Sequence, residues 1–272
     1  KFEKVIKTKI KKNYLLLTID DAFKSFYINA WPILKQKKIP FILFVSTREI
    51  GKYGYMTWEE IKEVEAYNFV TIGNHSHTHE YLVDWDEKKI FNDINTSINI
   101  FEKELGYSPK IFSYPFGEYS INLKKIVADL NFEFAFGQHS GVIDPTKNFL
   151  ELPRFPINEK YGEIKRFKSI LKTLPFPYEK ITPENRYLKN NENPPEVKIK
   201  FFKDLINVQN INCYSNEGNV WKKSDVQFIS KNELVILLKE KFQSERGRIN
   251  CSLWEENGKW RWLGIQYVIA EY

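Results

Sequence analysis

The first 155 residues alternate between short apolar runs and amphipathic segments, and this alternation restricts the fold more than any other feature of the chain. The apolar runs predict buried strands over 13–20, 40–47, 69–75, 110–117 and 132–138, and the segments between them predict helices over 22–38, 57–67, 86–106 and 122–131. Strands that are apolar almost throughout are buried on both faces, so the pattern favours a parallel sheet in an α/β fold. Active sites of such folds lie at the carboxyl ends of the strands.

The pattern changes after about residue 160. Residues 173–197 are rich in proline and asparagine, which is typical of a linker. Short alternating runs follow, and they predict a small antiparallel β domain. We therefore expect a first domain over 1–172, a linker over 173–197 and a β-rich accessory domain over 198–272. Trp260 and Trp262 share one face of a predicted strand, which favours core or domain packing, with sugar binding as the alternative.

Composition excludes some functions and leaves others open. The net charge is +6, but the lysines are scattered and no arginine-rich motif occurs, so a nucleic-acid partner is not expected. No apolar run approaches the ~18 residues that a membrane span needs. The chain begins at Lys1 without a methionine, and we expect that a natural N-terminal segment has been removed. Cys213 and Cys251 could pair in an exported protein or remain two buried thiols.

Polar residues stand where predicted strands end, and they suggest a metal site. The first strand ends in Asp20-Asp21, and the third ends in the segment His75-Ser76-His77-Thr78-His79. Two histidines and one carboxylate leave a position open on an ion such as Zn²⁺, which is a catalytic rather than a structural arrangement. His75 and His79 are four residues apart, so one helical turn would place both on one side.

The two adjacent carboxylates can divide the chemistry between them. Neighbouring side chains point in different directions from a strand, so one carboxylate can bind metal while the other acts as a base. Water held between a metal ion and a base is a nucleophile at neutral pH. The strand ends therefore predict a metal-dependent hydrolytic site.

These motifs resemble those of the polysaccharide deacetylase family, carbohydrate esterase family 4, whose domain is also called the NodB homology domain. Residues 18–22, TIDDA, resemble its first motif, usually TFDDG. Residues 75–79, HSHTH, fit its second motif, H-[S/T]-x-x-H, and residues 113–117, SYPFG, resemble its third, usually RPPYG. The resemblance covers roughly residues 13–160 and implies a distorted (β/α) barrel with a groove across the strand ends, here followed by the small antiparallel β domain.

The resemblance also implies a role for each matching residue. Asp20 would be the general base, and Asp21, His75 and His79 would bind one divalent metal ion, usually Zn²⁺, with Co²⁺ or Ni²⁺ as alternatives. Ser76 would support the second histidine through a hydrogen bond. The backbone N–H of Phe116 would stabilise the oxyanion, with Tyr114 and Pro115 beside it on the substrate side. By its spacing His77 is not a ligand, which leaves it a packing or solvent role, or a substrate contact.

Three positions depart from the family pattern. Ala22 replaces the glycine of the first motif, and Ser113 stands where many members have an arginine that orients the base. Arg154 lies at or near the place of the histidine that usually serves as general acid, and it could supply the missing positive charge beside Asp20. His139, the remaining histidine, is then a candidate for the general acid, with a structural role in its loop as the alternative.

The resemblance implies a metal-dependent hydrolase that removes N-acetyl groups from amino sugars of a polysaccharide or glycoconjugate. The alternatives are an O-acetyl esterase acting on a glycan, a catalytically weak carbohydrate-binding member of the family, and a structural zinc site. The expected partner is an acetylated glycan, with no nucleic acid and no membrane span. We expect an extracytoplasmic location if an export signal has been removed, with the cytoplasm as the alternative.

Overall fold

The computed structural model describes residue 6 and residues 14–202, 207–256 and 258–270. The chain forms two compact units, each of which combines separate stretches of sequence. The first unit comprises residues 1–116, 122–136 and 147–151, and the second comprises 117–121, 137–146 and 152–272.

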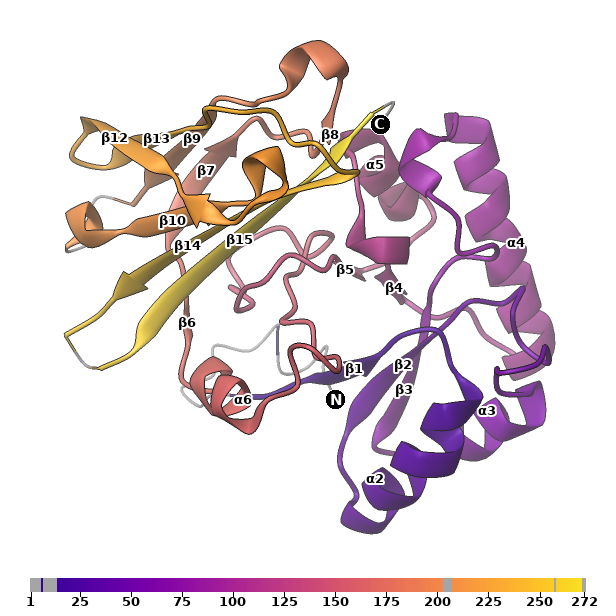
Figure 1. Cartoon of the computed structure of the whole chain (residues 1–272). Coiled ribbons are helices and arrows are strands. Elements are labelled where there is room, and N and C mark those ends of the chain that lie inside the picture. Colours follow the sequence, from indigo (N-terminus) through magenta and orange to yellow (C-terminus); the bar gives the residue numbers. More distant parts are fainter. Residues whose placement is uncertain (1–5, 7–13, 203–206, 257, 271–272) are drawn as a thin grey trace. The chain divides into compact units, whose positions relative to one another are not determined.

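The first unit contains the parallel sheet that the alternation predicts. Within the described residues, five strands pair in sequence order and all in parallel. They are β1 (Leu17–Ile19), β2 (Phe41–Val45), β3 (Val70–Asn74), β4 (Ile111–Ser113) and β5 (Phe134–Phe136) (Figure 1). The carboxyl ends of the strands therefore meet at one edge of the sheet, where the polar residues of the motifs follow.

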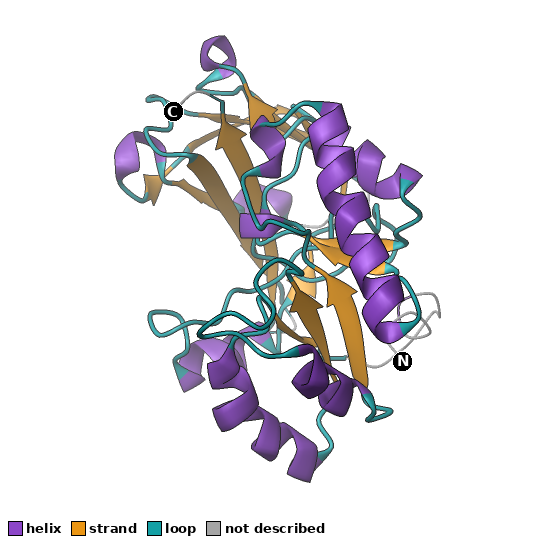
Figure 2. Ribbon diagram, turned by 90° about the vertical axis from the view of Figure 1, so that its right-hand side faces the viewer, coloured by secondary structure: helices purple, strands orange, loops and turns teal. Residues whose placement is uncertain are grey.

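The connections between these strands are helical, as expected. They contain a π-helical segment (Phe26–Ala30), α2 (Trp31–Lys37), α3 (Trp58–Glu65), α4 (Glu87–Leu105) and α5 (Ile121–Asp129); α4 is the longest helix in Figure 2. The Thr57 hydroxyl accepts a hydrogen bond from the Glu60 N–H, and the Glu60 carboxylate accepts one from the Thr57 N–H. This capping box begins α3, and Gly106, with a φ of 79°, ends α4.

The core explains why the strands are apolar on both faces. Phe41, Leu43 and Val45 of β2 share a cluster with apolar residues of the surrounding helices, including Trp31 of α2, Ile61 of α3 and Phe101 of α4. The alternate residues of β2, Ile42 and Phe44, face the other way and are also buried. Each such side chain stabilises the fold by about 1.5–3 kcal/mol through burial.

Gly73 of β3 allows one of these side chains to approach the histidine segment. A Cβ atom at position 73 would lie 2.4 Å from the ring of Phe44, a distance that real Cβ contacts do not reach. The Phe44 ring therefore lies directly against the strand, with its centroid 6.3 Å from that of His75. Close packing of a fully buried ring restricts the strand end from which His75 projects.

The second unit contains two β-sheets that share one core. Within the described residues, one sheet has the order β11 (Lys222–Lys223), β10 (Asn212–Ser215), β14 (Arg246–Trp254), β15 (Trp260–Ile269), β6 (Leu174–Pro175), with β8 (Tyr187–Leu188) also pairing with β15. The other has the order β12 (Asp225–Ser230), β13 (Glu233–Leu237), β9 (Val197–Phe201), β7 (Tyr178–Thr182). Most pairs are antiparallel, as the sequence predicts, although β6 and β8 run parallel to β15.

The boundaries of this unit differ from the predicted ones. Residues 152–172 group with the C-terminal sheets and include α6 (Ile164–Ile170), a helix that is not among the predicted ones. The predicted linker over 173–197 contains β6, β7 and β8. Its prolines and asparagines suggested a linker, yet Ile181 and Leu188 are buried in the core shared by the two sheets. A few buried apolar side chains are enough to place a polar segment in a sheet.

The tryptophans of β15 lie on the face of the strand opposite the core. Leu263, Ile265 and Tyr267 face inward, so Trp260 and Trp262, which alternate with them, lie on the opposite face. Trp260 is 43% exposed and meets the ring of Trp254 edge to face at 4.9 Å. The two tryptophans share one face, as the alternation predicts, and the Trp262 ring packs against Phe155 with centroids 6.0 Å apart.

Cys213 and Cys251 form a disulfide, which decides between the two readings of the sequence. They lie opposite each other on the antiparallel pair β10–β14, inside the core of the second unit. The bond joins residues 38 apart in the chain. A cross-link over a loop of that length restricts the unfolded chain and stabilises the fold.

Replacing both cysteines by alanine is expected to lower the free energy of unfolding by about 3–4 kcal/mol, the value for a loop of this length. Urea unfolding of the variant and of the wild type, each with and without reductant, measures the difference. Reductant should destabilise only the wild type. Equal stability of the two proteins without reductant would contradict a stabilising cross-link.

Candidate metal centre

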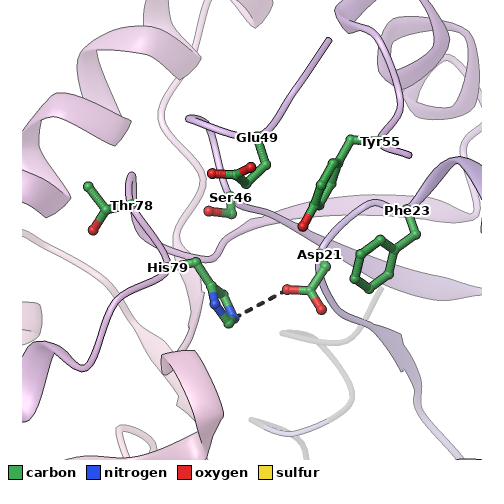
Figure 3. A pocket seen from close by; sticks show the side chains of 7 residues that line it. All are labelled: Asp21, Phe23, Ser46, Glu49, Tyr55, Thr78 and His79. Carbon is green, nitrogen blue, oxygen red and sulfur yellow. Dashed lines mark ion pairs between the residues drawn. The ribbon is translucent and has the colours of Figure 1, made fainter. Parts of the chain in front are cut away.

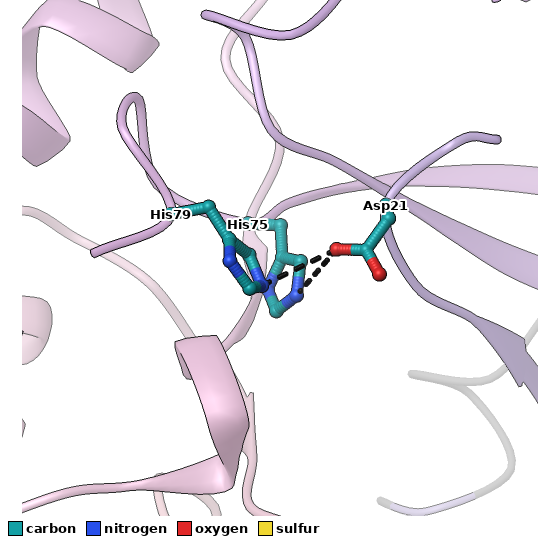
Figure 4. A group of neighbouring side chains, drawn as sticks. All are labelled: Asp21, His75 and His79. Atoms are coloured by element: carbon teal, nitrogen blue, oxygen red, sulfur yellow. Dashed lines mark ion pairs between the residues drawn. The ribbon is translucent and has the colours of Figure 1, made fainter. Parts of the chain in front are cut away.

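Three predicted ligands converge at the carboxyl ends of the strands. Asp21 follows β1, His75 follows β3 directly, and His79 lies four residues further along. One ligand atom from each residue, a carboxylate oxygen or an imidazole nitrogen, lies within 4.8 Å of the other two. Figure 4 shows both rings turned toward the Asp21 carboxylate. Asp21 Oδ1 is 3.5 Å from His75 Nε2 and 3.2 Å from His79 Nε2.

The ring of His75 is held in the orientation that a metal ligand requires. Its side chain is buried, and Nδ1 lies 2.7 Å from the carbonyl oxygen of Ser113 at the end of β4. A carbonyl can only accept, so Nδ1 donates in this bond, and Nε2 is the ring nitrogen that faces Asp21 and can bind an ion. Hydrogen bonding of the non-ligating nitrogen is the usual way in which proteins orient a histidine ligand.

His79 reaches the site through an irregular loop and not through the predicted helical turn. Ser76 and His79 have φ values of 66° and 55°, in the left-handed region that non-glycine residues rarely adopt. The Ser76 hydroxyl oxygen accepts a hydrogen bond from the His79 N–H at 3.0 Å, and Asn74 Oδ1 accepts one from the Ser76 N–H at 2.8 Å. The loop thus curls back, so that both imidazoles face Asp21.

The electrostatic surroundings favour a neutral His79. Burial lowers the pKa of His79, and the neighbouring His75 lowers it further, while Asp21 and Asp20 oppose this shift. A neutral imidazole has the lone pair that a metal requires. Two imidazole nitrogens and one carboxylate oxygen are a donor set that suits a divalent metal ion and leaves room for further ligands. The residues of this centre therefore fit the ion that the motifs imply.

A pocket of about 240 Å³ opens beside the metal centre (Figure 3). Its walls come from the segments after β1, after β2 and after β3, and from the segment before α3; they are lined by Asp21, Phe23, Ser46, Glu49, Tyr55, Thr78 and His79. The rings of Phe23 and Tyr55 lie 5.0 Å apart. Burial raises the pKa of Tyr55, as do the charges of Glu49 and Asp21, so its hydroxyl stays protonated at neutral pH and can donate a hydrogen bond.

The third motif places Phe116 against the metal centre. Its ring stacks on Tyr81, with centroids 4.2 Å apart, and meets the His79 ring edge to face at 4.7 Å. Tyr114 and Pro115 are both buried, and the Tyr114 hydroxyl donates to the carbonyl of Leu150. The Tyr114 side chain therefore anchors the end of β4, which differs from the substrate contact that the motif suggested.

Arg154 and His139 lie in the second unit, where they are joined to each other. The backbone N–H of Arg154 donates to the carbonyl of His139 at 3.0 Å. The side-chain Nε of Arg154 donates to the carbonyl of Gly137 at 2.8 Å. The His139 ring lies 5.8 Å from that of Tyr119. The segment 137–146, which follows β5, is thus tied to residue 154.

Several residues of the site are not marked by any motif or pattern in the sequence. Glu49 and Tyr55 line the pocket from a connection that has no family motif. The Ser113 carbonyl orients His75 through a backbone atom, which any residue type could supply. Asp93 of α4 binds the histidine loop, whereas in the sequence it is one residue of a predicted amphipathic helix. The one signal in the sequence that could have identified Asp93 is an acidic residue at a position of the helix that faces the core.

Comparisons with known proteins agree with the motifs. Residues 7–135 match the sequence profile of the polysaccharide deacetylase family. The chain is 26% identical over 176 residues to poly-β-1,6-N-acetyl-D-glucosamine N-deacetylase of Staphylococcus aureus, a match that covers 59% of this chain and 61% of that protein.

Solved structures show a related fold. The Streptococcus pyogenes deacetylase PplD, in complex with acetate, has a TM-score of 0.57 at 22% identity, covering 62% of this chain and 77% of that one. IcaB from Ammonifex degensii has a TM-score of 0.51 at 25% identity, covering 57% and 72%.

Residues 7–135 thus match the polysaccharide deacetylase family, as the motifs predict. Its parallel sheet has the distorted (β/α)-barrel fold of the NodB type. The match spans 61% of the length of the S. aureus relatives.

Proposed function

We propose that this protein is a metal-dependent hydrolase that removes N-acetyl groups from amino sugars of a polysaccharide. The observation that carries the proposal is the convergence of Asp21, His75 and His79 beside an open pocket, with Asp20 next to Asp21 in the chain. The name of the S. aureus relative gives poly-β-1,6-N-acetyl-D-glucosamine as its polymer, which supports an N-acetylated glycan as the substrate class.

Asp21, His75 and His79 would hold the ion, and Zn²⁺ suits their nitrogen and oxygen donors best, with Co²⁺ and Ni²⁺ as alternatives. When bound, such an ion polarises a carbonyl group and lowers the pKa of water. Ser76 would keep the loop in the conformation that presents His79, through its bond to the His79 N–H.

Asp20 would act as the general base. It would take a proton from the water that attacks the acetamide carbonyl, and the backbone N–H of Phe116 would stabilise the negative oxygen that develops. Collapse of the tetrahedral intermediate breaks the C–N bond, and the amine takes up a proton as acetate leaves. Hydrolysis of an O-acetyl ester at the same site would follow the same steps, with an alcohol as the leaving group.

His139 and Arg154 are the proposed acid and the proposed cationic partner of Asp20. The expected result of His139→Ala is loss of the alkaline limb of the pH–rate profile, because that limb reports deprotonation of the acid. Arg154→Ala should reduce turnover sharply. An alkaline limb that persists in His139→Ala, or turnover close to normal in Arg154→Ala, would remove that residue from the mechanism.

An extracytoplasmic location fits the disulfide Cys213–Cys251, because such bonds persist in oxidising compartments. Among the described residues, no helix has the length and apolar character to cross a membrane. The location can be tested by counting free thiols in the protein isolated from its own cells, with acid added at lysis to stop thiol exchange. Two reactive thiols per chain would count against export.

Acetate release from acetylated glycans tests the proposed function. The substrates are poly-β-1,6-N-acetylglucosamine, N-acetylated chitin oligosaccharides and an O-acetylated glycan, each with and without a chelator. We expect release from an N-acetylated polymer, loss of release with chelator, and recovery when Zn²⁺ is added back. Release that the chelator leaves unchanged would overturn the metal-dependent mechanism, and binding without release would favour the carbohydrate-binding alternative.

A further inference from the structure

The loop that carries His79 is held in an unfavourable conformation. Ser76 and His79 both have positive φ values, and only two residues with ordinary φ separate them. Non-glycine residues remain in this region only where the surrounding structure holds them there. His75 is different, because it directly follows the last residue of β3 and the Ser113 carbonyl orients its ring. The geometry of the site therefore depends most on what fixes residues 76–79.

Asp93 of α4 binds the middle of this loop. One carboxylate oxygen accepts the His77 N–H at 2.9 Å, and the other accepts the Thr78 N–H at 3.1 Å and the Thr78 hydroxyl at 2.7 Å. Asp93 is buried, with 6% of the residue exposed. A buried carboxylate is tolerated when hydrogen-bond donors compensate for its lost hydration, and here all three donors come from the loop between the two histidine ligands.

The segment after β2 holds the loop from another direction. The His77 carbonyl accepts hydrogen bonds from the Arg48 N–H at 3.0 Å and the Ser46 hydroxyl at 3.2 Å. Nδ1 of the His77 ring lies 2.9 Å from the Thr47 hydroxyl. His77 thus has a packing role, one of the two readings of the sequence. The loop is fixed between α4 and the end of β2.

We propose that Asp93 is a positioning residue that fixes the His79 loop for metal binding. By holding the N–H groups of residues 77 and 78, it keeps residue 79 in the left-handed conformation that turns its ring toward Asp21. The inference rests on the proposed metal site, and it adds a helix residue outside the family motifs to the parts that build that site. Partners that orient metal ligands typically change metal affinity by 10–100-fold when they are removed.

Zn²⁺ affinity, measured by competition with a chromophoric chelator, tests the proposal without any activity assay. Asp93→Ala is expected to weaken Zn²⁺ binding by about 10–100-fold. Thr78→Val removes only the hydroxyl donor and should weaken binding less, which keeps the test available if Asp93→Ala does not fold. In the Co²⁺-substituted protein, the visible absorption bands report ligand geometry, and Asp93→Ala should change them.

Phe101→Leu is the matched control for loss of helix stability. Phe101 is buried on α4 two turns beyond Asp93, and its ring packs against Trp58. At a comparable loss of Tm, this variant should retain the Zn²⁺ affinity and the Co²⁺ spectrum of the wild type.

The outcomes separate this proposal from the proposed function. Wild-type affinity in folded Asp93→Ala and in Thr78→Val, or an equal loss in Phe101→Leu, would overturn the role of Asp93 while the metal-dependent function stands. Wild-type protein that binds no Zn²⁺ would overturn both.

Discussion

Asp20→Asn is expected to lower the rate of acetate release by about 10²–10⁴-fold, the usual contribution of a general base. Asparagine has nearly the same shape as aspartate, but its amide does not accept a proton at neutral pH. Asp20 is not among the three residues whose ligand atoms converge. The variant should therefore still bind Zn²⁺, and the loss should fall on kcat.

The charge of Asp20 acts on His79, one of the three residues of the metal centre. Its carboxylate acts to raise the pKa of His79, which places it within electrostatic reach of that ligand. Asp21→Asn is the matched control, because it makes the same chemical change at the adjacent residue that lies in the ligand cluster. That variant should lose Zn²⁺ affinity as well as activity. Turnover of Asp20→Asn within tenfold of wild type would show that another group takes the proton.

The parallel sheet and the approximate ends of its strands were predictable because burial leaves a strong pattern in sequence. Runs such as residues 41–45 are apolar throughout, since both faces of β2 are covered. A cluster of two histidines and one carboxylate was predictable from the strand ends, and the choice of Asp21 over Asp20 as the ligand followed from the resemblance to the family motifs. Composition did not predict β7, whose buried Ile181 sits among exposed polar residues.

The path of the histidine loop could not be read from spacing. A separation of four residues is compatible with a helical turn, and it is equally compatible with a loop that contains two left-handed residues. The difference arises from contacts of the loop with Asp93 and Thr47. Both residues are distant from the loop in sequence. The same reason hid Glu49 and Tyr55, because only the folded chain brings them to the pocket.

His75→Ala is expected to abolish both Zn²⁺ binding and acetate release. The substitution removes one of three ligands and the hydrogen bond that His75 donates to the Ser113 carbonyl, a loss of about 0.5–1.5 kcal/mol of stability. In the wild type, Zn²⁺ at one hundred times its Kd should stabilise the fold by about 2.7 kcal/mol, seen as a rise in Tm. His75→Ala should show no such rise, whereas Asp20→Asn should keep it.

His77→Ala is the control for loss of a histidine from the same loop. Its ring contacts Thr47 and lies outside the ligand cluster, and the substitution leaves the His77 N–H that binds Asp93 in place. This variant should keep most of the Zn²⁺-dependent rise in Tm. If His77→Ala lost the rise and His75→Ala retained it, the ligand assignment would be wrong. Zn²⁺ binding and acetate release are measured separately. Comparison of His75→Ala with His77→Ala therefore distinguishes a residue that binds the ion from a residue that only fixes the loop.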